Sequence, residues 1–242
     1  MLKIILLLVL FSFLNLFAKE YMTQINPIEK IEIRSQSSGE IKYVNEELES
    51  NFVKLNQVLI EINSKDEELE LQKERSSFSI QKEIVKIKAE NYQAKNRIKG
   101  ISRYEKSNEK LSFLESKKEL VLTQQNIKKL QNEISKKVFR IENRYISTIF
   151  VKKDEYVNIG DKLFDMYNIS NLKITLYLTQ KEIKSLVNKN IFIDGVQSDF
   201  KIYKINKVKD EIKVSRYKVD FIMKNKTLDN YFFNEIVKVE IK

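Results

Sequence analysis

The stretches NFVKLNQVL (residues 51–59) and EYVNIGDKL (residues 155–163) share one pattern, with valine third, asparagine or glycine sixth and leucine ninth. The sixth residue, Asn56 or Gly160, must turn the chain between two short apolar runs, and these residue types accept the left-handed conformation at the lowest steric cost. The pattern therefore predicts an internal repeat. Because each half is too short to bury a core alone, we expect the two halves to pair into one β domain.

Residues 64–141, between the two repeats, have a different character. Lys, Glu, Gln and Ile dominate, proline is absent and Gly100 is the single glycine, a composition typical of long helices and coiled coils. Arg103 is midway between Asn63 and Asn143 and lies inside a polar patch at residues 102–108. We expect the chain to fold back there as an antiparallel hairpin of two helices.

Three apolar stripes run along the expected helices. The first follows spacings of four and three: Ile80, Ile84, Ile87, Asn91, Ala94, Ile98 and Ile101. The second recurs mainly every seven residues: Phe113, Leu120, Ile127, Ile134 and Ile141, with Leu130 in a companion position. We expect these two stripes to face each other as the internal seam of the hairpin. The third is Leu71, Phe78, Val85 and Tyr92. It is interpreted either as a contact with a neighbouring chain or as a partly exposed row.

Composition excludes several classes of function. The 44 Lys and Arg exceed the 34 Asp and Glu, giving a net charge of +10, but the lysines alternate with glutamates and no arginine cluster is interleaved with aromatics, so no nucleic-acid partner is expected. Cysteine and histidine are absent, which excludes thiol nucleophiles, Ser-His-Asp chemistry and the common zinc, haem and iron-sulfur ligand sets. The carboxylates at residues 66–68 lie in a Lys-rich helical run and are interpreted as solvent-facing. We expect no catalytic residue, no cofactor, no metal site and no enzymatic activity.

The chain begins with an apolar run from Ile4 to Phe17, followed by Ala18. A run of this length is short for a bilayer, and Ala18 is a suitable cleavage position, so residues 1–18 are predicted to be a signal peptide, with an uncleaved anchor as the alternative. No later segment is apolar enough to span a membrane. The mature chain is expected to be soluble outside the cytoplasm.

The repeat also carries a resemblance. Ser38-Gly39-Glu40-Ile41 with residues 53–59, and then residues 157–164, resemble the split lipoyl-like domain of periplasmic adaptor proteins, also called membrane fusion proteins or the HlyD family. Asn56 stands where that family usually has glycine, and residues 140–147 replace its usual opening of the second half. The resemblance implies an α+β fold, in which an antiparallel α-helical coiled-coil hairpin is inserted in a split lipoyl-like β-sandwich and a β-barrel domain follows. Gly39, Asn56 and Gly160 are its lipoyl-like turn positions.

The resemblance gives a division of the whole chain. The expected segments are a signal peptide (1–18), an N-terminal strand segment (19–38), lipoyl-like half 1 (39–63), the α-helical hairpin (64–142), lipoyl-like half 2 (143–169) and the β-barrel domain (170–242). The hairpin replaces the turn that would present a modified lysine in a true lipoyl or biotin carrier, so acyl carriage is not expected.

By the same resemblance, the chain would link an inner-membrane transporter, of the resistance-nodulation-division (RND) or ABC type, to a TolC-like outer-membrane channel. It would act in the periplasm, associated with the inner membrane, as a ring-forming homo-oligomer that supports export of small molecules or ions. In such adaptors the hairpin tip carries an Arg, an aliphatic residue four later and a Ser seven beyond, and Arg97, Ile101 and Asn108 have this spacing. Arg103 and Ser112 are a second pair, and an ordinary solvated tip is the alternative.

Other classes of function remain open from the sequence. One is a periplasmic binding or chaperone protein that delivers cargo to a transporter, although four methionines without His or Cys argue against soft-metal binding. A second is an adaptor of an ABC or type I secretion system, and a third is a purely structural coiled-coil protein. The short hairpin and single barrel favour an efflux pump.

Overall fold

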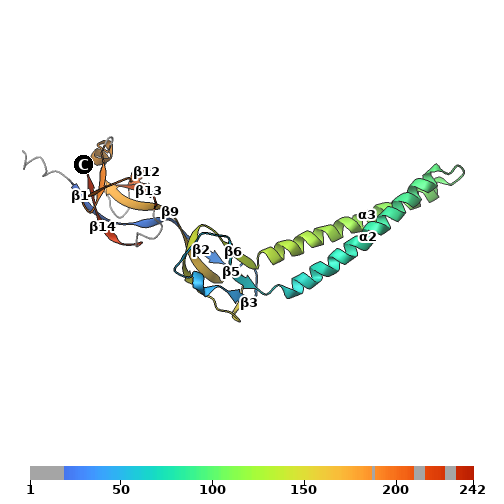
Figure 1. Cartoon of the computed structure of the whole chain (residues 1–242). Coiled ribbons are helices and arrows are strands. Elements are labelled where there is room, and N and C mark those ends of the chain that lie inside the picture. Colours follow the sequence, from blue (N-terminus) through green and yellow to red (C-terminus); the bar gives the residue numbers. More distant parts are fainter. Residues whose placement is uncertain (1–18, 187–188, 210–215, 227–232) are drawn as a thin grey trace, which may run out of the picture.

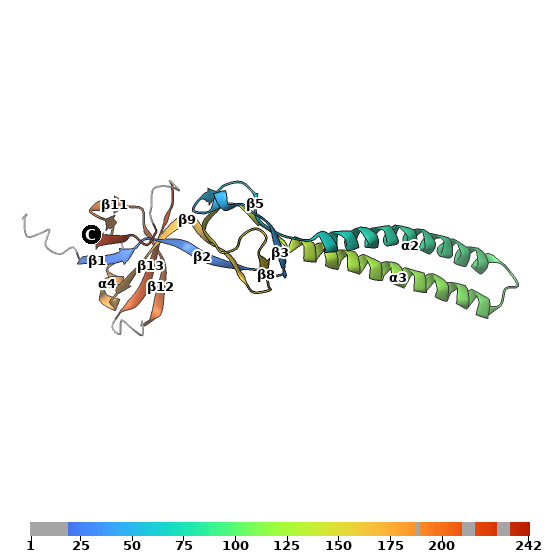
Figure 2. The same ribbon diagram turned by 90° about the horizontal axis from the view of Figure 1, so that it is seen from below.

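The computed structural model describes residues 19–186, 189–209, 216–226 and 233–242, so the expected signal peptide lies outside the described residues. The molecule is an elongated rod with three parts (Figure 1). The helices α2 (Lys65–Arg97) and α3 (Arg103–Ser135) project from a central β unit, and a terminal β unit lies at the opposite end. The same three parts follow one another in the view from below (Figure 2).

The central β unit flanks the hairpin in sequence. Its elements are β3 (Gly39–Val44), a short 3-10 helix (Glu46–Leu48), β4 (Phe52–Val53), β5 (Gln57–Ile62), β6 (Val138–Ile141), β7 (Arg144–Ile149), β8 (Tyr156–Val157) and the first part of β9 (Lys162–Leu178). One sheet has the order β6-β5-β3-β8, and β4 and β7 join the sheet that contains β9.

The two repeats exchange strands in this unit. The short strand β8 of the second repeat pairs with β3 of the first, and β4 of the first pairs with β7 of the second. Equivalent hydrogen bonds accompany the exchange: the Ile41 N–H donates to the Glu155 carbonyl at 2.8 Å, and the Ile146 N–H donates to the Asn51 carbonyl at 3.0 Å. Each half therefore completes the backbone pairing of the other, which explains why neither would be stable alone.

The turns of the two repeats agree at one position and differ at another. Ser50 and Asp154 occupy equivalent places and both have positive φ, 58° and 65°. Gly160 also has positive φ, 93°, as expected, but its counterpart Asn56 does not, so the prediction of a left-handed Asn56 is wrong. The chain passes through Asn56 without the left-handed conformation that Gly160 adopts at the equivalent place.

The other turn glycine of the repeat, Gly39, is required by packing. Its φ is +155°, and a Cβ built on it would lie 2.8 Å from Cγ2 of the fully buried Ile62. A side chain there would have to displace a core residue. Gly39 thus lets the first strand of the repeat lie directly against the core.

The core of the central unit is drawn from both repeats. Its buried apolar residues are Ile41, Val53, Leu59, Ile60, Ile62, Ile141, Ile146, Val151, Val157, Leu163 and Phe164. Phe139 packs edge to face on Phe164, with ring centroids 6.2 Å apart. Burial of these side chains is the main stabilising contribution to this unit.

The terminal β unit is built from both chain ends. Its strands are β1 (Lys19–Gln24), β10 (Ile191–Ile193), β11 (Val196–Ser198), β12 (Lys201–Lys209), β13 (Tyr217–Lys224) and β14 (Ile236–Ile241), with the helix α4 (Gln180–Lys184). β1 pairs with β14, and β12 and β13 continue the sheet of β9. A second core, which includes Leu172, Leu176, Phe221 and Val239, fills this unit.

A two-stranded ribbon connects the two β units. β2 (Asn26–Arg34) runs antiparallel to β9, from Asn26 opposite Lys173 to Arg34 opposite Lys162. The expected boundary between residues 169 and 170 falls inside the continuous strand β9. The two units therefore share strands, which favours a stiff connection over a flexible linker.

Candidate functional site

The hairpin is the part of the molecule that projects furthest from the β units, and its inner face differs from the prediction. On α3 the expected stripe does face α2: Phe113, Leu120 and Ile127 are half-buried. Between them Ser116 and Thr123 are buried, and the Thr123 hydroxyl donates to Oε1 of Gln81 at 2.8 Å. The prediction for this stripe fails only at its end, because α3 stops at Ser135 and the chain re-enters the β unit. Ile141 belongs to β6 and to the core there, so the expected hairpin limit of residue 142 is wrong.

On α2 the two predicted stripes exchange roles. Leu71, Phe78, Val85 and Tyr92 are half-buried against α3, and the Tyr92 ring stacks on Phe113 at 6.2 Å. The isoleucine stripe that was expected to form the seam faces solvent: Ile80 is 63%, Ile84 41% and Ile87 55% exposed. That prediction is wrong. The physical reason is that the seven-residue spacing of the α3 stripe matches the Leu71–Tyr92 stripe, and the pairing leaves the isoleucines on a flank.

The tip of the hairpin is also placed differently from the prediction. The chain turns at residues 98–102, with Gly100 at φ +98°, so Ser102 is the one residue of the polar patch that belongs to the turn. The second helix begins with a capping box, in which the Ser102 hydroxyl accepts from the Glu105 N–H and the Glu105 carboxylate accepts from the Ser102 N–H. Residues 103–108 are therefore the first turns of α3. The Gly100 and Ser102-x-x-Glu105 signals were available in the sequence and locate the turn better than the midpoint.

The three predicted docking residues lie close to this turn in sequence. Arg97 is the last residue of α2, Ile101 is a half-buried residue of the turn, and Asn108 is an exposed residue of α3. Arg97 and Asn108 make no side-chain hydrogen bond or ion pair with any described part of the chain. Of the second pair, Arg103 is the exposed first residue of α3, and Ser112 is half-buried.

Two further apolar residues lie at the tip: Tyr104 was not singled out from the sequence, and Ile98 was expected in the internal seam. Ile98 is 51% exposed and Tyr104 is 74% exposed, so both present apolar surface at the end of the rod. Basic side chains outnumber acidic ones across residues 96–110. Apolar surface next to positive charge is suited to a partner that offers helix ends, whose free carbonyls carry partial negative charge.

The base of the hairpin is fixed by a buried lysine. Nζ of Lys137, which is 7% exposed, donates to the Asn63 carbonyl at 2.9 Å and to the Glu67 carboxylate. Burial alone would raise the pKa of Glu67, but the hydrogen bonds and the Lys137 charge outweigh it and the pKa is lowered. Glu67 therefore has a structural partner, so its interpretation as solvent-facing is wrong. This ion pair ties the first turn of α2 to the short segment between α3 and β6.

The opposite end of the rod has its own charged contact. Lys19, at the start of β1, forms an ion pair with Glu182, which caps α4 with Thr179. Burial would raise the pKa of Glu182, but Lys19 and the hydrogen bonds from Thr179 lower it to about 2. Met22, on β1, is 70% exposed.

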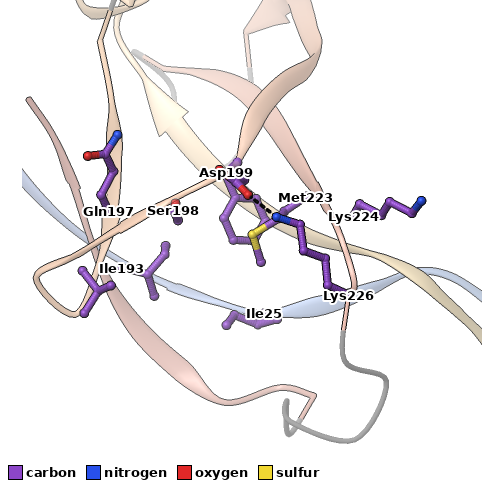
Figure 3. Close-up of a pocket in the computed structure, with 10 residues that line it drawn as sticks. Ile25, Ile193, Gln197, Ser198, Asp199, Met223, Lys224 and Lys226 are labelled. Atoms are coloured by element: carbon purple, nitrogen blue, oxygen red, sulfur yellow. Dashed lines mark hydrogen bonds and ion pairs between the residues drawn. The ribbon is translucent and has the colours of Figure 1, made fainter.

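The terminal β unit also contains a pocket of about 490 Å³ (Figure 3). Ile25, Ile193 and Met223 form apolar parts of its wall, and Asp199 and Lys226 pair with each other beside it at 2.8 Å. A binding pocket usually presents a few polar groups that converge on the ligand. Here Asp199 and Lys226 satisfy each other, and the other polar residues of the lining are Gln197, Ser198 and Lys224.

Metal binding and membrane crossing are two further features to consider in the described residues. No group of three or more Asp and Glu side chains in the described ranges is arranged to hold a metal ion. Among the described residues, no helix has both the length and the apolar character needed to cross a membrane.

Comparison with known proteins shows which solved structures share the fold of this chain. No protein-family model matches the sequence, and no curated protein matches it. Among solved structures, the membrane fusion protein Spr0693 from Streptococcus pneumoniae R6 superimposes with a TM-score of 0.69 at 8% identity, covering 93% of this chain and 98% of that one. A MacA-MexA chimeric protein containing the Pseudomonas aeruginosa MexA α-hairpin domain gives 0.66 at 15% identity, covering 93% and 81%. A putative efflux transporter from Bacteroides eggerthii gives 0.65 at 14% identity, covering 93% and 68%.

The chain has the fold of membrane fusion proteins. A match over 93% of the chain cannot come from the hairpin or from one β unit alone, so the likeness extends to their order and arrangement. At these identities the likeness concerns the membrane-fusion-protein fold and leaves partners and cargo to other arguments.

Proposed function

We propose that this chain is an adaptor that links an inner-membrane transporter to a TolC-like outer-membrane channel and supports the export of small molecules or ions. The observation that carries the proposal is the two-ended rod with the fold of membrane fusion proteins. Each helix of the hairpin has 33 residues, which at about 1.5 Å per residue gives a reach of about 50 Å beyond the β units. A protein of this shape is suited to hold two partners apart and connected.

The hairpin tip is the proposed channel-docking site. Arg97 and Asn108 are exposed and have no side-chain hydrogen bond to the described part of the chain, and Ile101 lies between them in the turn. An arginine and a short amide can donate to helix-end carbonyls of the channel, while the aliphatic residue packs beside them. Ile98 and Tyr104 extend this surface.

The terminal β unit and the N-terminal strands form the proposed transporter-facing end. We place the protein in the periplasm, associated with the inner membrane, exported by residues 1–18. In this proposal the hairpin is a coiled coil, the central unit a lipoyl-like sandwich, the terminal unit a β-barrel domain, and several copies form a ring. An RND transporter is the preferred inner-membrane partner, and an ABC transporter, including that of a type I secretion system, is the second. The chain contributes no chemistry of its own.

A cargo-delivering binding protein is less well supported. The pocket of the terminal unit is large enough for a small ligand, but its charged pair Asp199 and Lys226 is mutually satisfied and mostly exposed. A binding protein of this kind also has no need for a hairpin that extends away from its pocket. The adaptor role accounts for the hairpin, whereas the binding role does not.

The test is site-specific photocrosslinking in the cells that make the protein. A photoreactive residue is placed at Ile101 or at Asn108, and at Lys73 near the base of α2 as a matched exposed control. Captured partners are identified by mass spectrometry. The proposal expects an outer-membrane channel subunit from the tip positions and not from Lys73. Capture of soluble periplasmic proteins alone would refute it and favour the binding-protein role.

A further inference from the structure

The strand β12 lies at an edge of the terminal β unit. It is the first strand in the order β12-β13-β9-β7-β4, so it pairs with β13 on one side, and no other described strand pairs with its second side. Every residue of β12 is exposed. Figure 2 shows β12 and β13 running side by side, away from the long axis of the rod. The backbone N–H and C=O groups on the second side of such a strand are a template for an added strand.

The register of β12 places apolar side chains on the core face of the sheet. Ile202 lies opposite Phe221 and Ile205 opposite Val219, and directly paired residues of antiparallel strands point to the same face. A register shift between residues 202 and 204 keeps both isoleucines on this face although they are three positions apart. Phe221 and Val219 are 1% and 0% exposed, whereas Ile202 is 45% and Ile205 38% exposed. The core of the terminal unit is therefore left open beside β12.

A hollow of about 210 Å³ lies at this opening. Its apolar lining comes from Ile202 and from four residues of the terminal core: Leu186, Ile191, Phe200 and Phe221. An apolar side chain placed there would remove its own surface and theirs from water. A sheet edge that is only protected against pairing often carries inward-pointing charged residues. Isoleucines at these inward positions instead favour an edge that receives a further strand.

The charge of β12 indicates what kind of strand this is. Lys201 lies opposite Ile222 and Lys204 opposite Asp220, on the outward face, and the Asp220 carboxylate accepts from the Thr175 hydroxyl at 2.7 Å. A second copy of β12 would bring lysines against lysines, which is unfavourable, whereas an acidic strand would be attracted. The strand contains no Asp or Glu, and its lysines form no ion pair within the described chain: Lys201, Lys204, Lys207 and Lys209.

We propose that β12 accepts an extended segment of another protein as an added strand, and that this segment alternates acidic with apolar residues. Successive side chains of a strand point to opposite faces. The apolar residues of the segment would lie beside Ile202 and Ile205 over the hollow, and its acidic residues would pair with Lys201 and Lys204. Backbone hydrogen bonds would supply affinity, and the alternating side chains would supply specificity. A lipid surface offers no matching row of backbone donors and acceptors.

The added strand would be short. Beyond Ile205 the register with β13 shifts again before Lys209, and the Val208 N–H donates to Oδ1 of Asn206 at 3.2 Å. That N–H is already engaged, and a bulge twists a strand edge away from a partner. The contact is therefore confined to residues 201–205. Strand addition there does not require the adaptor role to be correct, because it depends only on the folded terminal unit.

Peptide binding to the purified full chain tests this. The probe is a short peptide with blocked ends that alternates glutamate and valine. One control peptide has the same composition with its valines grouped together, and a second alternates lysine and valine. Binding up to millimolar concentration is measured by fluorescence anisotropy, and amide hydrogen exchange of β12 locates the contact.

Two variants with the same change of net charge are compared. The edge variant carries Lys201→Glu and Lys204→Glu. The control variant carries Lys117→Glu and Lys118→Glu on α3, where both lysines are also exposed and form no ion pair with another described residue. Because exposed charges are altered in both variants, both are expected to fold.

The glutamate-valine peptide is expected to bind the chain and to protect the amides of residues 201–205. The edge variant should weaken this binding about tenfold, and the control variant by less than about twofold. The lysine-valine peptide should bind the edge variant more tightly than the original chain. This exchange of preference would show that the lysines of β12 select the charge of the added strand.

Several results would overturn the proposal. Absence of binding, equal binding of the grouped peptide, or equal losses in the two variants would exclude strand addition at β12. Self-association of the chain that the edge variant abolishes would assign this edge to a second copy. Binding of phosphatidylglycerol vesicles through Lys201 and Lys204, without protection of β12 by the peptide, would assign it to a membrane surface. Each of these results leaves channel capture by the hairpin tip, and so the adaptor role, unaffected.

Discussion

The central β unit and the hairpin are stabilised in different ways, although one is inserted in the other. Eleven described apolar residues of the central unit are buried, most of them completely. The 33-residue helix α2 buries no residue, and α3 buries only Ser116 and Thr123. The central unit therefore has a core of its own, whereas the hairpin has one narrow seam and exposed apolar stripes. Exposed apolar side chains of the kind found on the hairpin are typical of an interaction site.

The largest expected effect comes from the core of the central unit. Phe164→Ala removes a side chain that is 1% exposed and packs on Phe139, and should lower the free energy of unfolding of this unit by about 3 to 5 kcal/mol through lost burial and a cavity. This loss in the free energy of unfolding is measured by the amide hydrogen exchange of β5 and β9 at increasing urea concentrations. The matched comparison is Ile84→Ala on the hairpin, expected to change the monomer by less than about 0.5 kcal/mol. Equal losses would contradict the contrast between the two regions.

The next effect tests the close contact at the repeat turn. Gly39→Ala introduces a Cβ 2.8 Å from Ile62 at a φ unfavourable for alanine, and should destabilise the central unit by about 2 to 3 kcal/mol. Gly160→Ala is the control, because its Cβ would meet no atom within 4 Å and only backbone strain of about 1 kcal/mol remains. Thermal unfolding by circular dichroism compares them. A milder effect at Gly39 than at Gly160 would show that the core adapts around it.

A third pair of variants sharpens the assignment of the hairpin seam. Val85→Asp places a charge in the inner seam and should destabilise the hairpin by about 1 to 2 kcal/mol, whereas the adjacent Ile84→Asp lies on the exposed isoleucine stripe and should leave the monomer almost unchanged. Helical circular dichroism during urea unfolding gives the result. If Ile84→Asp were the more damaging in the monomer, the isoleucine stripe would be the internal seam after all.

The smallest expected effect is the loss in acid of the Glu67–Lys137 ion pair, which lies where the hairpin meets the central unit. The pKa of Glu67 is lower in the folded protein than in the unfolded chain, so its pairing with Lys137 contributes stability above the unfolded value of about 4.3. That contribution is lost as the pH falls through the lower, folded pKa. Hydrogen exchange in the first turn of α2 should therefore rise below about pH 4, and Glu67→Gln should remove this acid dependence. Acid dependence that survives in Glu67→Gln would assign it to another group.

The order of the structural elements along the chain could be predicted from the sequence more readily than the contacts between them. The repeat of residues 51–59 and 155–163 and the change of composition between them indicated a hairpin inserted in a β unit, because periodicity and turn residues report local structure directly. The exchange of β4 and β8 between the halves could not be seen, since pairing of short strands depends on long-range contacts.

The choice of seam failed for a related reason. Both stripes of α2 have a helical spacing, and the isoleucine stripe is the more apolar, so composition alone favours the wrong one. Which stripe lies inside depends on the partner helix, where Ser116 and Thr123 make room for close approach and Phe113 meets Tyr92. The position of the tip was predicted from the midpoint of the segment between the two repeats. The Ser102–Glu105 capping box and Gly100 locate the turn more accurately.

The most direct test of the adaptor role is crosslinking from both ends of the rod in the same cells. Photoreactive residues are placed at Asn108, near the hairpin tip, and separately at Met22, which is 70% exposed on β1 of the terminal unit. The adaptor role predicts that Asn108 captures an outer-membrane channel subunit and that Met22 captures an inner-membrane transporter. Capture of the same partner from both ends, or of no membrane protein from either, would contradict a chain that bridges the two membranes.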